Sequence, residues 1–199
     1  MPSLKVLFIG GSGIISSACS WLAVARGIDL SVLNRGHSTH RPLPPETTTL
    51  RADIRDPGSA LAALGDREFD VVVNWVAYTP QQVQADIDMF RGRTGQYVFI
   101  SSASAYQTPP GRVPIVESTP LRNPFLEYSR NKIACEDLLV AAHRDDGFRR
   151  RSYGRRTRTT GPGFRSTAAG RPSPACGRRD VRHHRLLISS SRSLIEFSR

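Results

Sequence analysis

A short apolar segment near the start of the chain runs directly into a glycine-rich turn and then into a helical segment. Residues 4–9 read Leu-Lys-Val-Leu-Phe-Ile, which predicts a buried strand, and Gly10-Gly11-Ser12-Gly13 ends it. Residues 14–26 are typical of a helix, and Gly27 follows directly after them. A strand that turns at once into a helix constrains the fold strongly, because it favours a parallel sheet with crossover helices.

The turn also has the composition of a phosphate-binding loop. A tight turn without side chains lets the backbone approach a pyrophosphate, and the N–H groups at the helix start hold its charge. Ser16 stands at the third glycine position of such loops and is small enough to keep the helix close to the strand. A generic strand–helix turn is the alternative. The residues expected on the phosphates of a dinucleotide are Gly10, Gly13, Ile14 and Ile15.

Strand and helix patterns alternate along the rest of residues 1–147, and the strands are apolar on both faces. This pattern predicts a doubly wound α/β fold of the Rossmann type, a parallel sheet covered by helices on both sides with strand order 3-2-1-4-5. The expected strands are residues 30–33, 49–52, 70–75 and 96–100, and the expected helices are residues 57–64, 81–90 and 126–143.

In a fold of this kind, residues at the end of the second strand contact the adenosine ribose. Here this end carries Asn34 and Arg35 and no acidic residue. A guanidinium suits the 2′-phosphate of NADP, so the cofactor is expected to be NAD(P) with a preference for NADP. Asp53 and Ile54 follow the third strand and are expected beside the adenine. A solvent-facing arginine and an aspartate that only caps its loop are the alternatives.

A tyrosine and a lysine four residues apart on a predicted helix, Tyr128 and Lys132, face the same side of it. An ammonium near a phenol favours phenolate, which makes tyrosine usable as an acid or base near neutral pH. Ser102 ends the preceding strand and can hydrogen-bond the reacting oxygen. The tyrosine–lysine spacing alone arises often by chance, but chance is a poor explanation once the glycine-rich turn and this serine are added.

With these motifs the sequence resembles the extended short-chain dehydrogenase/reductases, and within them the bacterial NAD-dependent epimerase/dehydratase proteins. It is also similar to plant chloroplast stem-loop-binding proteins, which share the fold. The resemblance covers about residues 4–147. The segments that carry it are Phe8 to Gly13, Ala52 to Asp56, Ser101 to Tyr106 and Tyr128 to Lys132.

The resemblance implies a role for each matching residue. Ser102 corresponds to the catalytic serine or threonine, Tyr128 to the catalytic base, and Lys132 to its partner, which also holds the nicotinamide ribose. In sugar-nucleotide 4,6-dehydratases an Asp-Glu pair follows the catalytic threonine, but this chain has Ala103 and Ser104, which argues against 4,6-dehydration. The backbone expected to pass beside the cofactor belongs to Trp75, Val76 and Ala77.

The family pattern stops after Gly147-Phe148, and the composition changes there. Residues 1–147 hold 14 Lys and Arg against 15 Asp and Glu, a net charge of −1, whereas residues 148–199 hold 14 Arg against two acids, a net charge of +12. Only 14 of the last 52 residues are apolar, which is too few to build a core easily. Residues 148–199 are therefore expected to be an aberrant or disordered tail in place of a substrate domain.

A single-base deletion explains this tail. If each true codon joins the last base of one present codon to the first two bases of the next, Arg codons become Ser, Pro, Thr or Ala codons. One permitted reading from Phe148 is Phe-Pro-Ala-Thr-Val-Val-Arg-Pro-Ser-His-Thr-Tyr-Asp-Arg, which resembles the sixth strand and the loop beside the cofactor in the family. The alternative is a genuine basic tail.

The expected function is that of an NAD(P)-dependent oxidoreductase or epimerase on a nucleotide sugar or a similar hydroxyl or carbonyl substrate. An RNA-binding protein related to the stem-loop-binding proteins and a non-catalytic NADP-sensing regulator are the alternatives. Three scattered cysteines and the lack of a long apolar run indicate a cytoplasmic protein without a membrane partner. No metal and no nucleic-acid partner are expected, and a homodimer is possible for the full-length family form.

The frameshift prediction has a direct test. Sequencing the coding DNA across codons 145–180 would show whether a base is missing. Inserting one base near codon 149 should then restore a family-like sequence, and with it solubility and activity. A 199-residue chain that is already monodisperse and as active as the repaired one would make the arginine-rich segment a genuine part of the protein.

Overall fold

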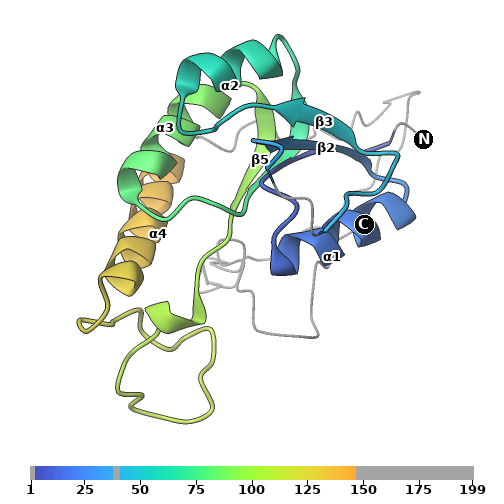
Figure 1. Cartoon of the computed structure of the whole chain (residues 1–199). Coiled ribbons are helices and arrows are strands. Elements are labelled where there is room, and N and C mark those ends of the chain that lie inside the picture. Colours follow the sequence, from blue (N-terminus) through green and yellow to red (C-terminus); the bar gives the residue numbers. More distant parts are fainter. Residues whose placement is uncertain (1–2, 38–40, 147–199) are drawn as a thin grey trace, which may run out of the picture.

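The computed structural model describes residues 3–37 and 41–146, and the expectations for residues 148–199 lie outside this part of the chain. Strands and helices alternate as predicted (Figure 1). The strands are β1 (Lys5–Ile9), β2 (Asp29–Asn34), β3 (Thr48–Arg51), β4 (Phe69–Asn74) and β5 (Thr94–Phe99). The helices are α1 (Ile14–Ala25), α2 (Pro57–Leu64), α3 (Pro80–Phe90), the 3₁₀ helix η1 (Ala103–Ala105) and α4 (Glu127–Asp146).

The five strands form one parallel sheet in the order β3-β2-β1-β4-β5, which confirms the predicted topology. β1 lies at the centre, where Phe8 pairs in register with Val32 of β2 and Val73 of β4. The carboxyl ends of all five strands therefore meet at one edge, and every predicted site residue stands at or after one of these ends or lies on α4.

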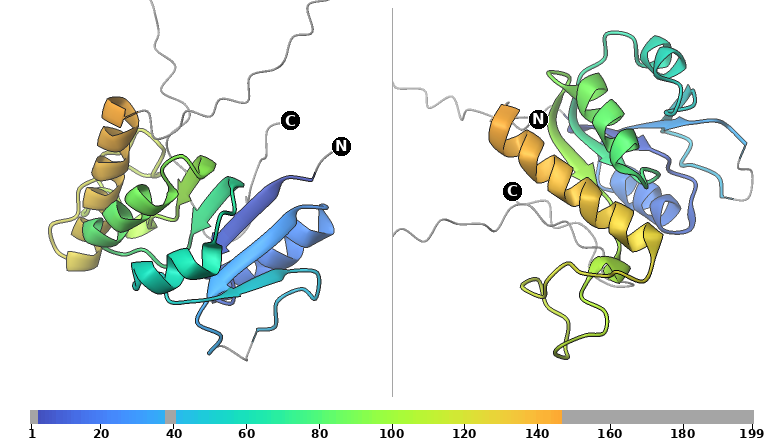
Figure 2. Two further views of the ribbon diagram at one scale, coloured as in Figure 1. Left: turned by 90° about the horizontal axis from the view of Figure 1, so that it is seen from above. Right: turned by 90° about the vertical axis from the view of Figure 1, so that its left-hand side faces the viewer.

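The two faces of the sheet bury alternate side chains of each strand. From β1, Val6 and Phe8 pack with Cys19 and Ala23 of α1 on one face. On the other face, the intervening β1 residues join a cluster that α2 and α3 cover, with members Leu7, Ile9, Leu33, Leu50, Ala60, Leu64, Val72, Met89 and Phe90. Helices α3 and α4 lie side by side on that second face (Figure 2), where Ile87 and Cys135 share a buried cluster.

Local signals explain where the helices begin. The Asp56 side chain accepts hydrogen bonds from the Gly58 and Ser59 N–H groups and thereby caps α2, which starts at a proline. The Thr79 and Gln82 side chains form a capping box at the start of α3. The predicted boundaries differ from the observed ones by at most three residues, and η1 has no counterpart among the predicted elements. Within the described ranges, no helix is both long and apolar enough to cross a membrane.

Candidate cofactor and active site

The glycine-rich turn between β1 and α1 is built for close approach of backbone. Gly10 has φ of +88°, and a Cβ atom added there would lie 2.9 Å from Val76 Cγ1. A Cβ atom on Gly11 would lie 2.8 Å from Val32 Cγ1. Larger residues therefore do not fit at either position, and the turn presents backbone rather than side chains.

The serines of α1 hold this turn in place. Ser16 is buried, and its hydroxyl accepts a hydrogen bond from the Gly13 N–H at 2.9 Å. The Ser20 hydroxyl donates to the Gly11 carbonyl at 3.2 Å. No side chain of the described residues caps the start of α1, which leaves the N–H groups of Ile14 and Ile15 for a ligand.

At the end of β2 the structure adds a cation that the sequence analysis did not single out. The side-chain oxygen of Asn34 accepts from the Gly36 N–H at 2.9 Å, and this turn brings Gly36 beside Arg51. A Cβ atom added to Gly36 would lie 2.6 Å from Arg51 Nε. Arg51 ends β3, so only the pairing of β3 with β2 reveals that it shares this corner with Arg35.

The two predicted adenosine residues Arg35 and Asp53 face each other across the same corner. The Arg35 guanidinium lies 3.9 Å from the Asp53 carboxylate, and the two side chains are 59 % and 39 % exposed. At this distance and exposure the pair contributes little to stability and can open for a ligand. Asp53 also accepts from the Arg55 N–H, whereas Ile54 packs against the core cluster under α2.

The turn after β4, predicted to pass beside the cofactor, is held from below by Asn74. This side chain is buried, and its Oδ1 accepts hydrogen bonds from the Val76 N–H at 2.7 Å and the Ala77 N–H at 2.8 Å. The Trp75 ring packs edge-on against Phe8 with its centroid 5.4 Å away. The buried Trp75 Nε1 has no hydrogen-bond partner within the described segments.

Asn74 in turn rests on a buried carboxylate that the sequence analysis missed. Its Nδ2 donates to Asp86 Oδ2 at 2.6 Å, and the Tyr97 hydroxyl donates to the same oxygen at 2.6 Å. Burial raises the pKa of Asp86 to about 6 despite both hydrogen bonds. The only signal in the sequence is an aspartate among the apolar positions Val83, Ile87 and Phe90 of α3.

Lys132 is almost completely buried, with 2 % of its surface exposed. Its ammonium donates to the Ala77 carbonyl at 2.7 Å and to the Ile100 carbonyl at 2.8 Å, so α4 is tied to the ends of β4 and β5. The ammonium also lies 4.9 Å from the ring centre of Tyr78 and 4.5 Å from that of Phe99. Burial is the main cause that lowers the pKa of Lys132 to about 8.

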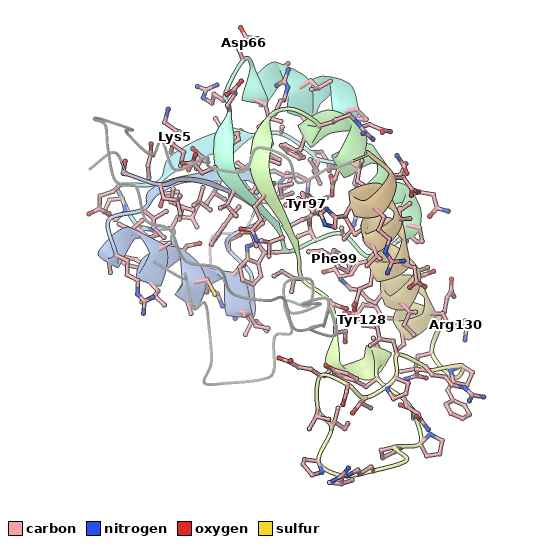
Figure 3. All side chains as sticks on the ribbon, turned by 180° about the vertical axis from the view of Figure 1, so that it is seen from behind. Lys5, Asp66, Tyr97, Phe99, Tyr128 and Arg130 are labelled. Atoms are coloured by element: carbon pink, nitrogen blue, oxygen red, sulfur yellow. The ribbon has the colours of Figure 1, made fainter. Side chains whose placement is uncertain are left out.

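Tyr128 lies one turn before Lys132, as predicted, at the start of α4 beside the end of β5 where Phe99 lies (Figure 3). Tyr128 is 44 % exposed, and the centre of its ring lies 5.8 Å from the Lys132 ammonium. The ring of Tyr78 lies 6.1 Å from it, so two phenols flank the ammonium where the sequence analysis identified one.

A chain of hydroxyl groups leads from Ser102 to α4. Ser102 Oγ lies 2.9 Å from Ser104 Oγ, and the buried Ser129 donates to Ser104 Oγ at 2.9 Å. The Ser104 N–H donates to Ser102 Oγ, and the Ser104 carbonyl accepts from Asn123. Ser102 is thus linked through Ser104 to Ser129, the residue after Tyr128. The sequence pattern did not indicate this bridging role of Ser104.

Comparisons with known proteins bear on the family and the fold of this chain. Residues 87–185 match the model of the NAD dependent epimerase/dehydratase family. A UDP-glucose 4-epimerase from Lactobacillus helveticus is 30 % identical over 163 residues, covering 73 % of this chain and 49 % of the relative. One from Streptomyces lividans is 28 % identical over 160 residues, covering 70 % of this chain and 48 % of the relative.

The chain belongs to the NAD-dependent epimerase/dehydratase family. This family assignment confirms the resemblance predicted from the sequence motifs. The family-model match continues beyond the described residues into the arginine-rich segment, and the frameshift stays a prediction.

Solved structures show the same fold. The UDP-glucose 4-epimerase from Brucella ovis in complex with NAD superposes with a TM-score of 0.64 at 23 % identity, covering 73 % of this chain and 49 % of that one. The enzyme from Bifidobacterium longum in complex with NAD⁺ and UDP gives a TM-score of 0.62 at 20 % identity, covering 71 % and 49 %. This family member thus spans about half the length of the curated relatives it matches.

The buried ammonium of this family member predicts a pH-dependent stability. Because the pKa of Lys132 is lowered from 10.5 to about 8 in the fold, the stability it contributes is present above 10.5 and is lost as the pH falls through about 8. We expect the difference in unfolding free energy between the parent and Lys132→Met to shift in favour of the parent by about 1–3 kcal/mol between pH 7 and pH 10.

Urea unfolding at several pH values measures this shift. The buried Cys19 and Cys135 both have a pKa of about 11 in the fold, so neither ionises there within this range. Parallel stability curves for the parent and the variant would contradict the prediction.

Proposed function

We propose that residues 1–147 form the NAD(P)-binding and catalytic half of an oxidoreductase of the epimerase type, which acts on a nucleotide sugar or a similar substrate with a hydroxyl or carbonyl group. The observation that carries the proposal is the direct bond from Lys132 to the Ala77 carbonyl. This bond joins the helix with the Tyr128–Lys132 pair to the turn that lies against Gly10. Two UDP-glucose 4-epimerases among the relatives support the substrate class.

The described residues fit a dinucleotide. The glycine-rich turn has no room for a Cβ atom at Gly10, and the uncapped start of α1 offers N–H groups to a phosphate. Trp75 adds a buried N–H without a partner in the described part of the chain. Gly10, Gly13, Ile14 and Ile15 would hold the pyrophosphate; Asn34, Arg35, Asp53 and Ile54 the adenosine; and Trp75, Val76, Ala77 and Lys132 the nicotinamide side.

When bound, the nicotinamide accepts or supplies the hydride. We assign the proton transfer to the Tyr128 phenol, whose exposed ring lies at the edge of the sheet. The Ser102 hydroxyl accepts from the Ser104 N–H and can donate its own proton to the reacting oxygen. The Lys132 ammonium, held by two carbonyls, supplies a positive charge that favours the phenolate, and its third N–H can bond a ribose hydroxyl.

We further propose a reducing, cytoplasmic location and a homodimer for the full-length form, with no nucleic-acid partner. Cys19 and Cys135 are free and buried, which suits a reducing compartment. Because the residues that bind substrate in the family follow residue 147, we propose that the 199-residue chain turns over poorly until the arginine-rich segment is repaired.

Tyr128→Phe tests the catalytic assignment. Removing the phenol hydroxyl should lower the interconversion of UDP-glucose and UDP-galactose at least about a hundredfold, as expected when a general acid–base group is lost. The assay uses both the 199-residue chain and its repaired form, and Glu127→Gln, an exposed change on the same turn, is the control. Unchanged turnover in the tyrosine variant would refute the assignment, and net NAD(P)H consumption would indicate a reductase.

Arg35→Asp tests the cofactor preference. Arg35 and Arg51 share the corner at the end of β2, so the parent should bind NADP⁺ more tightly than NAD⁺, and the substitution should level or reverse this order. Calorimetric titration measures both dissociation constants. Arg55→Asp makes the same charge change at an exposed position of the neighbouring loop and should leave the ratio unchanged. Equal affinities in the parent would remove the argument for NADP.

A further inference from the structure

Asp86 is a buried acid for which the proposed reaction has no use. This residue is 2 % exposed and belongs to α3, which carries no predicted site residue. Two groups donate hydrogen bonds to it, the Tyr97 phenol from β5 and the Asn74 amide from β4, and its charge helps to raise the pKa of the Cys135 thiol on α4. No lysine or arginine pairs with it in the described residues. A buried carboxylate without a cationic partner costs free energy, so its place in the core calls for a physical reason.

The hydrogen bonds of Asn74 suggest such a reason. An ionised carboxylate only accepts hydrogen bonds, so it requires the Asn74 amide to point Nδ2 toward it. Oδ1 of the same amide then faces the Val76 and Ala77 N–H groups and accepts a hydrogen bond from each. It is the only atom of the amide that can accept these bonds. The opposite amide orientation would place an N–H₂ donor against two N–H donors. The acid and the two backbone N–H groups thus favour the same one of two amide orientations that have nearly the same shape.

The consequence reaches the site through the turn. With both N–H groups held by Asn74, the Ala77 carbonyl lies 2.7 Å from the Lys132 ammonium. The same turn packs Val76 against Gly10, where the pyrophosphate is proposed to lie. A looser turn would therefore displace the Lys132 ammonium and the floor of the cofactor site together.

We propose that Asp86 is a positioning residue, which fixes the orientation of the Asn74 amide and thereby the shape of the 75–77 turn that holds Lys132. The part of the inference that concerns Lys132 as a cofactor ligand rests on the proposed function. The raised pKa of Asp86, about 6, supports the inference, because protonation should weaken the bond to Asn74 within an accessible pH range.

Amide hydrogen exchange at Val76 and Ala77 tests the proposal in the full chain. Asp86→Asn keeps the shape but makes the acceptor neutral and able to donate, so the protection of these two amides at pH 7.5 should fall about tenfold. In the parent, protection should fall by a similar factor between pH 7.5 and pH 5, whereas the variant should show no such dependence. Asp88→Asn, on the exposed face of the same helix, is the matched control and should behave like the parent.

Global stability separates positioning from simple structural support. Since the pKa of Asp86 is raised above its usual 3.8, its contribution to stability is full below about pH 4 and is lost as the pH rises through about 6. Asp86→Asn should therefore be at least as stable as the parent at pH 7.5 while its turn is looser. Unchanged protection at Val76 and Ala77, or a fall shared equally by Val72 in the central sheet, would overturn the proposal.

The dissociation constant for NAD⁺ provides a second measurement. We expect it to rise several-fold in Asp86→Asn and to stay unchanged in Asp88→Asn, because only the first substitution reaches the turn. An unchanged constant in Asp86→Asn would contradict the link from the turn to the cofactor site. If the parent itself binds neither NAD⁺ nor NADP⁺, the proposed function fails, and the exchange measurement still decides whether Asp86 positions the turn.

Discussion

The buried ammonium of Lys132 is the interaction on which the arrangement of the site depends. A charge that is almost fully removed from water must be hydrogen-bonded, and two backbone carbonyls at the ends of β4 and β5 meet this need. Because Lys132 belongs to α4, the same bonds fix where this helix crosses the carboxyl edge of the sheet. Tyr128, one turn earlier on α4, and Ser102, linked to Ser129, take their places from this helix.

Burial moves the two ionisable groups under the site toward their neutral forms. The pKa of Asp86 rises to about 6 and that of Lys132 falls to about 8, with loss of solvation as the largest cause for each. They do not pair with each other: one holds Asn74 and the other holds Ala77 and Ile100. Such shifted groups gather at functional sites, where a fixed polar arrangement matters more than the stability that it costs.

The corner where β2 and β3 end, proposed above to hold the adenosine, shows how a charge balance depends on strand pairing. Arg35 and Asp53 partly neutralise each other, and Arg51 adds a second guanidinium beside Gly36. A 2′-phosphate would meet two cations there, whereas a 2′-hydroxyl would meet the oxygens of Asn34 and Asp53. If the cofactor binds as proposed, the choice between NAD and NADP would depend in part on this exposed ion pair between Arg35 and Asp53.

The amino-acid sequence by itself determined the fold class, the strand order and the candidate residues, because these follow from local patterns. Apolar runs, the glycine-rich turn and the four-residue spacing of Tyr128 and Lys132 are visible within short stretches, and the sheet order follows from the alternation of elements. Only the tertiary structure decided the roles of Asp86, Arg51, Tyr78 and Ser104. Each of them acts through a partner that lies on another element or at least two residues away in the sequence. The energy of a buried hydrogen bond depends on that partner and on the exclusion of water, and a single position in the sequence shows neither.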